Sequence, residues 1–173
     1  MKKICVVVAS RANYGRIRSV LYNIKKHRGL ELQIILSASG VLDKYGDLTK
    51  LITKDGFKVN KKAYIVVEGG NPITMAKTTG LAVIELSSCF EDLKPDIVLT
   101  IADRYETMAT AIAATYMNIQ LAHTQGGEIT GSIDESVRHA ITKLAHIHFP
   151  ATEASKKNLI RLGENRKFIF NTG

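Results

Sequence analysis

The chain has 173 residues, which suits one domain and is long enough for a substantial hydrophobic core. Hydrophobic residues make up 45% and charged residues 23% of it, as in an ordinary soluble globular protein, and no apolar run approaches the roughly 18 residues of a membrane-spanning helix, so we expect no membrane partner. The formal net charge of +8 is spread over separate basic pairs without aromatic stacking or zinc-finger motifs, so we expect no nucleic-acid partner. Solvated helix ends and loops account for most of this charge, and an anionic, nucleotide-type ligand is the alternative.

The N-terminal stretch MKKICVVVAS resembles a secretion signal only superficially. Its apolar part is too short and is followed at once by Arg11, so a buried first strand at residues 3–9 is the better interpretation. Cys5 and Cys89 lie in apolar contexts, far apart in the sequence. They predict buried free thiols in a cytoplasmic protein and not a disulfide framework.

Strand-like and helix-like patterns then alternate to the end of the chain. Continuous or β-branched apolar runs predict strands at 3–9, 31–38, 58–67, 96–102, 119–124, 146–150 and 166–172. Apolar residues at helical spacing predict helices at 14–27, 46–56, 71–94, 104–118, 134–145 and 152–163. Pro72 suits a first helical turn, and Gly56 and Gly163 suit helix ends. This alternation with short connections predicts an α/β fold, a three-layer α/β/α, Rossmann-like open parallel sheet with helices on both faces.

Ligands of such sheets bind outside the carboxyl ends of the strands, where the strand order switches. Four predicted loops lie at that edge: 10–16 after the first strand, 38–40 after the second, 102–106 after the fourth and 123–128 after the fifth. These loops are therefore where we expect the functional residues.

The first of these loops, SRANYGR at 10–16, has neither the glycine fingerprint of dinucleotide-binding folds nor a Walker A motif. It argues against NAD and against ATP held in a phosphate-binding loop. Arg11 and Arg16 could instead meet a phosphate, helped by the partial positive charge of the following helix. The alternative is that Asn13 caps the helix and both arginines are solvated.

The loop ADRYE at 102–106 has a structural explanation of its own. Asp103 and Glu106 have the spacing of a capping box, with Asp103 as N-cap and Glu106 at the third helical position. Arg104 is less well explained by capping. One residue can both cap a helix and bind a ligand, so this interpretation leaves a functional role open.

The stretch HTQGGEITGSIDESVRHA at 123–140 is far more polar than a connection between two buried elements requires. Ser132 and Glu135 form a second capping-box pattern, and Asp134 and Arg138 are spaced to pair along the helix. Capping leaves four polar residues without a reason: His123, Gln125, Glu128 and Asp134. A group of acids at the ligand end of a sheet suits proton abstraction and donation, because their surroundings can drive two carboxyl pKa values apart. The paired glycines of this stretch allow a sharp turn or a close approach to a ligand: Gly126 and Gly127.

Two histidines in HIH at 146–148 share one face of a predicted strand. A metal site would need a third ligand, and no candidate ligand lies at a sequence spacing typical of metal sites. We therefore expect core or interface histidines and no metal. The chain also lacks the serine elbow of the α/β-hydrolases, and neither cysteine lies in a catalytic motif.

Three motifs in this order, SRANYG, DRYE and QGGEITGSIDESVRHAITKLAHIHF, together resemble the hydrolysing UDP-N-acetylglucosamine 2-epimerases, above all their sialic-acid-pathway branch. The resemblance covers essentially all 173 residues. It implies the first half of a GT-B type enzyme, in which two Rossmann-like domains enclose the active site. We therefore expect residues 1–173 to form a single N-terminal domain, without the C-terminal domain that carries much of the uridine and diphosphate site and a catalytic histidine.

The resemblance implies a reaction that converts UDP-N-acetylglucosamine (UDP-GlcNAc) to N-acetylmannosamine and UDP. UDP leaves by anti-elimination to a glycal, which is then hydrated, and no cofactor is required. The chemistry needs an acid–base pair around C2 and C3 and stabilisation of the departing diphosphate. The resemblance also implies a cytoplasmic homo-oligomer whose partners are a UDP-sugar, either UDP-GlcNAc or a diacetamido relative, and the missing C-terminal domain.

Site residues are carried over by matching motifs. Asp103 and Asp134 match catalytic carboxylates, and Gln125 stands where many relatives have a catalytic glutamate. Because an amide cannot act as a base, either Glu128 takes that role, or Gln125 only hydrogen-bonds the sugar, or the activity is altered. Asn13 stands where relatives often have aspartate. The expected substrate-binding residues are Arg11, which resembles a phosphate-contacting arginine, Arg16, Arg104, His123, Gly126 and Gly127.

Two other functions fit the same fold. A GT-B glycosyltransferase half-domain would look alike but would need no paired carboxylates in these loops. A non-catalytic domain that binds nucleotide sugars is the other alternative, and the amide at Gln125 keeps it open.

Overall fold

A computed structural model describes residues 1–172, apart from the side chain of residue 43. These residues form one parallel sheet in the order β3-β2-β1-β4-β5-β6. The strands are β1 (Lys2–Val8), β2 (Leu30–Ser37), β3 (Lys61–Ala63), β4 (Ile97–Ile101), β5 (Gln120–Thr124) and β6 (Ile147–Phe149). The α-helices are α1 (Arg11–Lys26), α2 (Leu48–Lys54), α3 (Pro72–Leu93), α4 (Tyr105–Tyr116), α5 (Ile133–Leu144) and α6 (Glu153–Arg161). The predicted alternation of strand and helix is confirmed.

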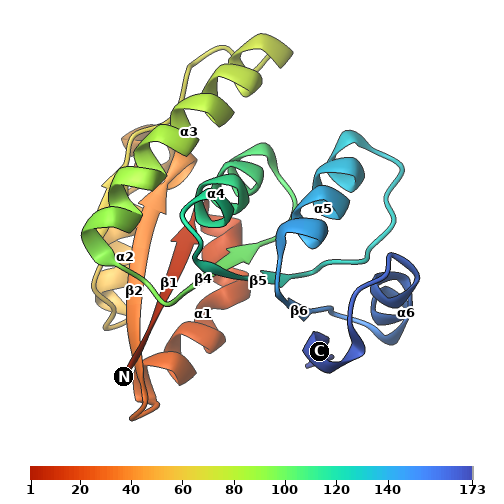
Figure 1. The fold of residues 1–173 in the computed structure, drawn as a ribbon. Coiled ribbons are helices and arrows are strands. Elements are labelled where there is room, and N and C mark those ends of the chain that lie inside the picture. The colour runs from red at the N-terminus through yellow and green to blue at the C-terminus, as the bar shows by residue number, and fades with distance from the viewer. Residues whose placement is uncertain (173) are drawn as a thin grey trace.

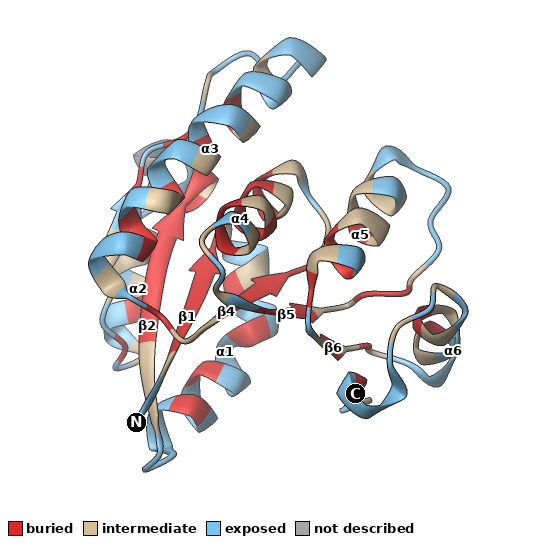
Figure 2. Ribbon diagram, in the orientation of Figure 1, coloured by how far each residue is buried: buried red, intermediate tan, exposed pale blue. Residues whose placement is uncertain are grey.

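The sheet has a hydrophobic cluster on each face. Helices α3, α4 and α5 cover one face and α1 and α2 the other, while α6 lies beyond the β6 edge (Figure 1). Both faces of the central strands are therefore buried, which explains why residues 4–8 of β1 and 34–36 of β2 are continuous apolar runs and not alternating ones (Figure 2). Among residues 1–172, no helix is both long and apolar enough to cross a membrane.

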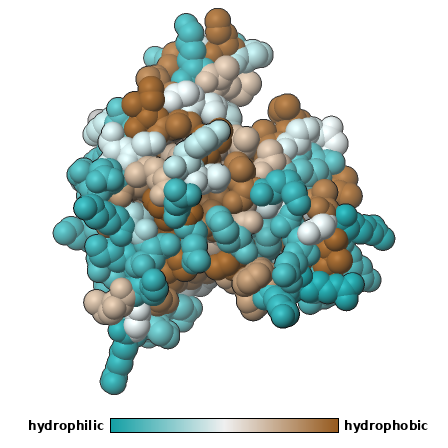
Figure 3. All heavy atoms as spheres, in the orientation of Figure 1, coloured by the Kyte–Doolittle hydropathy of each residue, from teal (hydrophilic) through white to brown (hydrophobic). Residues whose placement is uncertain are grey.

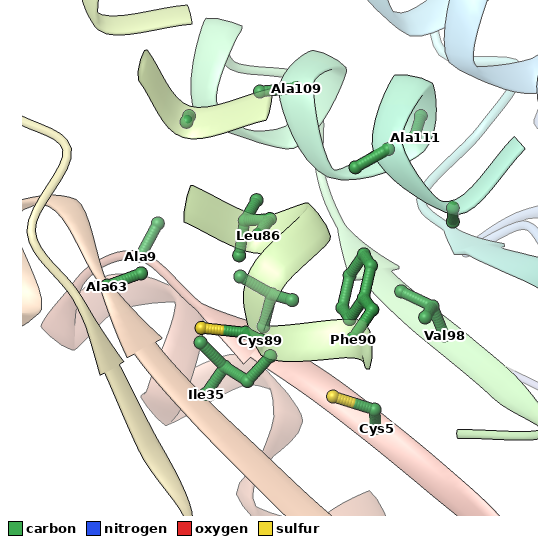
Figure 4. Packing of buried hydrophobic residues seen from close by; sticks show 14 of the residues in the cluster. Cys5, Ala9, Ile35, Ala63, Leu86, Cys89, Phe90, Val98, Ala109 and Ala111 are labelled. Atoms are coloured by element: carbon green, nitrogen blue, oxygen red, sulfur yellow. The ribbon is translucent and has the colours of Figure 1, made fainter. Parts of the chain in front are cut away.

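The two cysteines belong to the cluster under α3 and α4. Both thiols are free and buried, as predicted, and Figure 4 shows them beside Leu86 and Phe90 of α3. Alanines of α4 face the same cluster, which lets the helix lie close to its neighbours. Burial raises the pKa of the Cys5 thiol and also that of Cys89, so the reactive thiolate is disfavoured at both positions.

Several predicted boundaries differ from the observed ones for identifiable reasons. Helix α1 begins at Arg11 because the Ser10 side chain accepts a hydrogen bond from the Asn13 N–H, so the proposed Asn13 cap is wrong. The predicted third strand shrinks to β3. The predicted strand at 166–172 is instead a 3₁₀ turn, Arg166–Phe168, followed by a single bridge between Ile169 and His148.

The helix signals of Pro72, Gly56 and Gly163 are confirmed. Pro72 is the first residue of α3, and Asn71 before it forms a capping box with Thr74. Gly56 and Gly163 follow the ends of α2 and α6 with φ of +84° and +90°, a left-handed conformation that favours glycine.

Candidate functional site

The strand order switches once, between β1 and β4. From β1 the chain runs outward through β2 and β3, and it then returns to β4, β5 and β6 on the other side. Such a switch opens a crevice at the carboxyl ends of the two central strands, where ligands of open parallel sheets bind. The loops 10–16, 102–106 and 123–128 follow β1, β4 and β5, so they meet at this edge as predicted.

A buried arginine joins the loops that follow β4 and β5. The side chain of Arg138, on α5, is 2% exposed and pairs with the Oδ2 atom of Asp103, to which both Nε (2.9 Å) and Nη2 donate. Its Nη1 donates to the carbonyl oxygen of Glu128, and its Nη2 lies 3.4 Å from the hydroxyl of Thr130. Arg138 therefore fixes the position of the Asp103 carboxylate relative to the Glu128 loop.

This pairing overturns two predictions. Asp103 does not cap α4, whose N-cap is Arg104 without a side-chain hydrogen bond, because the Asp103 carboxylate turns to Arg138. Arg138 pairs with Asp103 and not with Asp134, which lies one helical turn before Arg138. The Arg138 side chain points into the protein, whereas Asp134 lies half-buried at the start of α5.

The second predicted capping box forms in an altered way. Ser132 is the N-cap of α5, but its side chain makes no capping hydrogen bond. The Glu135 carboxylate instead accepts hydrogen bonds at 2.6 Å from the backbone N–H groups of Thr130 and Gly131, and these bonds lower its pKa. Glu135 thus connects the backbone of Thr130 and Gly131 to α5, the helix that carries Asp134.

His123 lies inside the protein. Its exposed fraction is 0%, and its Nε2 lies 3.0 Å from the carbonyl oxygen of Ala102, to which it donates in the neutral ring. Its Nδ1 is 3.5 Å from the hydroxyl of Thr142. Burial lowers the pKa of His123 to about 4, so the ring is neutral at pH 7. The expectation that His123 contacts substrate is therefore wrong, because both ring nitrogens bind protein groups and no solvent reaches them.

The paired glycines also face the protein interior. A side chain on Gly127, whose φ is +83°, would clash with the carbonyl oxygen of Ser155 on α6 and lie 3.0 Å from Leu159. One on Gly126 would lie 3.2 Å from the His123 ring. Both glycines are buried, so the missing side chains let the loop pack against α5 and α6 and are not explained by a ligand approach.

Gln125 has an unusual backbone and a cationic neighbour. Its φ is +63°, a left-handed conformation that is rare for residues other than glycine, and Ala102 after β4 has φ of +66°. Strained residues of this kind collect at functional sites. The Gln125 side chain accepts a hydrogen bond of 3.4 Å from Nη1 of Arg16, so Arg16 is held beside the β5 loop.

Arg11 and Arg104 face a cavity of about 820 Å³ that the loops after β1, β2, β3 and β4 enclose. The guanidinium group of Arg11 reaches across to Gly46, where an added side chain would lie 3.0 Å from its Nη2. The lining residues do not include the catalytic candidates: Asp103, Gln125, Glu128 and Asp134. The predicted site therefore divides into a cationic cavity and a group of carboxyl and amide side chains beside it.

Arg104 links these two parts. Burial alone would lower the pKa of its guanidinium group, but the charges of Glu106 and Asp134 and the adjacent Tyr105 outweigh burial and raise it. The charge of Asp134, one of the catalytic candidates, thus acts on the Arg104 guanidinium group in the cavity wall.

Sequence reasoning assigned no functional role to Glu106, which lines the cavity next to Arg104. The capping pattern concealed it, because the same spacing explains a glutamate without any ligand. No signal in the sequence separated the two roles, because one residue can both cap a helix and bind a ligand.

The histidines of the HIH motif bind different protein groups. Nε2 of His148 lies 3.2 Å from the Glu164 carboxylate, and Nδ1 of His146 accepts a hydrogen bond from the backbone N–H of Leu121. In the part of the chain that the structure describes, no group of three or more His, Cys, Asp or Glu side chains is placed to hold a metal ion.

Comparison with known proteins identifies relatives of similar sequence and fold. A family model described as UDP-N-acetylglucosamine 2-epimerase matches residues 22–173. The GDP/UDP-N,N'-diacetylbacillosamine 2-epimerase (hydrolyzing) of Campylobacter jejuni is 41% identical over 99% of this chain and 45% of its own length. The UDP-N,N'-diacetylbacillosamine 2-epimerase (hydrolyzing) of Legionella pneumophila is 39% identical over 100% of this chain and 46% of its own.

A solved structure of a UDP-N-acetylglucosamine 2-epimerase superposes with a TM-score of 0.88 at 26% identity, covering 99% of this chain and 48% of that one. This likeness confirms the predicted Rossmann-like class. The chain spans about half the length of the curated relatives that it matches.

Proposed function

The chain belongs to the UDP-N-acetylglucosamine 2-epimerase family, and we propose that it supplies the N-terminal half of an active site that hydrolyses a UDP-linked 2-acetamido sugar with inversion at C2. UDP-GlcNAc, which would give N-acetylmannosamine and UDP, and a UDP-linked diacetamido sugar are the two candidate substrates. The observation that carries the proposal is the Arg138 contact, which fixes the Asp103 carboxylate beside the β5 loop and the start of α5.

The proposed reaction begins with removal of the proton from C2 by a carboxylate. The electron pair of that C–H bond forms the C1=C2 double bond, and the C1–O bond breaks so that UDP leaves with its electron pair. The electron pair of the C1=C2 bond then takes a proton at C2 from a carboxylic acid on the opposite face, and water bonds to C1 through its oxygen and passes its extra proton to the carboxylate so formed. Two carboxyl groups with separate surroundings suit these two proton transfers.

We assign the two proton transfers to Asp103 and Asp134. Both hydrogen bonds from Arg138 go to Oδ2 of Asp103, which leaves Oδ1 free of that arginine. Asp134 lies half-buried in the first turn of α5, where the partial positive charge of the helix favours a carboxylate. The charge of Asp134 reaches Arg104, so the acid–base group and the cationic cavity can act on one ligand.

The remaining site residues bind and orient in this proposal. Arg11 and Arg104, from two loops of the cavity, attract the diphosphate. Gln125, held by Arg16, hydrogen-bonds the sugar, since an amide cannot remove a proton. Glu128, whose backbone Arg138 fixes, supplies a further carboxylate at the same edge.

The assignment is tested by UDP release in the full-length protein that contains this chain. Asp103→Asn and Asp134→Asn should each lower turnover by about 10²- to 10⁴-fold, the usual contribution of general acid–base catalysis. Asp92→Asn is the control, because the Asp92 side chain is 59% exposed on α3 and pairs only with Lys61 among the described residues. Near-normal turnover in both site variants would sink the assignment.

The 173-residue chain alone should release no UDP at an ordinary enzymatic rate, because it covers 45% of the Campylobacter relative. Efficient turnover by this chain would refute the half-site proposal. Gln125 supports a second candidate, a non-catalytic nucleotide-sugar-binding domain, since it offers no base. Calorimetry with UDP-GlcNAc and UDP distinguishes the two, because binding without turnover in the full-length protein favours the second.

We also propose a cytoplasmic homo-oligomer whose sugar product is used in the synthesis of sialic acid or a related sugar acid. The exposed apolar side chains of α3 support self-association: Ile73 is 62%, Leu81 43% and Ile84 64% exposed. Figure 3 shows hydrophobic atoms at the surface over the upper part of this helix. Isolated apolar side chains are ordinary on a surface, but several along one helix are typical of contact sites.

A further inference from the structure

A buried histidine contacts the backbone that carries Asp103. His123 lies on β5, beside β4 in the sheet, and its Nε2 is 3.0 Å from the carbonyl oxygen of Ala102. Ala102 directly precedes Asp103, and its φ of +66° is a left-handed conformation that residues other than glycine rarely adopt. A strained conformation of this kind persists only where the surrounding structure fixes it. The hydrogen bond from His123 is such a constraint on Ala102.

The partners of the His123 ring determine which of its nitrogens carries the proton. Burial lowers the pKa of His123 to about 4, so the ring is neutral at pH 7 and has a single N–H. A carbonyl oxygen can only accept a hydrogen bond, so this N–H is on Nε2 and donates to Ala102. Nδ1 is then an acceptor, and the Thr142 hydroxyl, 3.5 Å away, faces it as the donor. The hydrogen bonds therefore run in one direction, from Thr142 through His123 to Ala102.

Helix α5 thus holds Asp103 at two points. Arg138 donates to Oδ2 of the Asp103 carboxylate. Thr142, one helical turn further along α5, acts through His123 on the carbonyl group before Asp103. One contact alone would let the carboxylate pivot about it, whereas two contacts fix both the side chain and the backbone of Asp103. Buried polar networks are rigid when each member has its partner.

Gly126 leaves the space that the contact between Thr142 and His123 needs. A side chain at Gly126 would lie 3.2 Å from Nδ1 of His123 and 3.2 Å from the Thr142 hydroxyl oxygen, which is closer than ordinary van der Waals contact. It would therefore press against both groups at the point where they meet. The first glycine of the pair in this loop is thus explained by the His123 contacts.

We propose that His123 is a positioning residue, which aims the Asp103 carboxylate at C2 of the sugar by holding the Ala102 carbonyl group, without touching the substrate. This inference rests on the proposed function, which assigns a proton transfer to Asp103. A displacement of about 1 Å in a catalytic group can lower a rate roughly 10²-fold, so a residue that acts only through the backbone can strongly affect turnover. A neutral imidazole suits this role, because it donates an N–H without adding a charge that would compete with Arg138 for Asp103.

The test measures UDP release in the full-length protein that contains this chain, with kcat calculated per folded enzyme. His123→Leu removes the donor and keeps much of the volume, so it should lower kcat about 10²-fold. His123→Gln keeps an N–H near the position of Nε2, so its kcat should lie within about tenfold of the wild-type value. Thr142→Val keeps the side-chain shape and frees the His123 ring, so it should lower kcat by about three- to tenfold.

A second background separates positioning of Asp103 from general support of the core. In a protein that already carries Asp103→Asn, His123→Leu should lower kcat by less than about a further threefold, because the carboxylate that His123 positions is gone. A residue that only supports the core would lower kcat by the same factor in both backgrounds. If His123→Leu does not fold, Thr142→Val takes its place in both comparisons.

Thr110→Val is the matched control for Thr142→Val. Thr110 is 2% exposed on α4, and its hydroxyl donates to a backbone carbonyl of its own helix, that of Glu106. The substitution therefore removes one buried hydroxyl hydrogen bond without involving His123, and kcat should not change.

Wild-type kcat in both His123→Leu and Thr142→Val would overturn the inference and leave the proposed function standing. So would a loss that is equally large with and without Asp103→Asn, or an equal loss in the Thr110 control. Normal turnover in Asp103→Asn alone would contradict the proposed function itself, and the inference with it.

Discussion

Replacing Arg138 with methionine removes a buried charge while keeping most of the side-chain volume. The Arg138 side chain is 2% exposed and that of its partner Asp103 is 20% exposed. Loss of one partner of a buried ion pair typically costs about 3–5 kcal/mol, because the other charge is left without compensation. Water can reach Asp103, so we expect the lower end, about 3 kcal/mol, together with the loss of the bond to the Glu128 carbonyl. For a chain of this size, that corresponds to a melting temperature roughly 6–12 °C lower.

Urea unfolding of four proteins measures this coupling: the wild type, Arg138→Met, Asp103→Asn and the double variant. Residues in direct contact typically couple by about 0.5–3 kcal/mol, so the double variant should lose less stability than the sum of the two single losses. Arg18→Met is the control. The Arg18 side chain is 59% exposed in its pair with Asp55, and it should cost less than about 1 kcal/mol.

Three results would refute the reasoning about Arg138. The first is a loss of less than about 1 kcal/mol in Arg138→Met, which would mean that the pair does not hold the two loops together. The second is additivity within about 0.5 kcal/mol between the Arg138 and Asp103 variants. The third is an equal loss in the Arg18 control.

Three other predictions concern stability. His123 has an ordinary pKa of 6.5 and a folded-state pKa of about 4, so the unfolded chain binds more protons between those pH values. The free energy of unfolding should therefore fall by up to about 3 kcal/mol as the pH drops from about 6.5 to about 4. Urea unfolding of His123→Gln should show a weaker dependence of this free energy on pH, and an unchanged dependence would contradict this account. Gly127→Ala should cost about 3 kcal/mol in the same assay, because the new methyl group meets the Ser155 carbonyl oxygen at a positive φ, and a loss below about 1 kcal/mol would contradict the packing. Gly80→Ala should instead stabilise the chain by about 0.5–1 kcal/mol, because Gly80 lies inside α3 with open space around it. A lower melting temperature would contradict this expectation and indicate that another group covers α3 at Gly80.

The architecture was predictable because its signals are local. Apolar runs and helical spacing depend on neighbours within a few residues, and they predicted the alternation of strands and helices and the edge at which the loops meet. Pro72, Gly56 and Gly163 acted in the same way, each through its own backbone preference. Boundaries failed where a local pattern had to compete with a neighbour, as at Ser10, which caps α1 in place of Asn13.

The arrangement of the candidate site was not predictable in this way. Spacing along the helix suggested that Arg138 pairs with Asp134, and spacing along the loop suggested that Asp103 pairs with the α4 backbone. The structure joins Arg138 to Asp103 instead, across 35 positions of the chain, because β4 and β5 are neighbours in the sheet and α5 packs over them.

By itself, the sequence determined the elements, the parallel sheet, the loops that meet at its carboxyl edge and the resemblance to a family. Only the tertiary structure decided which polar side chains of those loops are buried, which are paired and which face a cavity. It placed His123 inside the core and Glu106 in the cavity wall, the reverse of what their motifs suggested. The physical reason is that element formation follows short-range periodicity, whereas burial and ion pairing depend on strand order and helix packing, which bring together residues far apart in the chain.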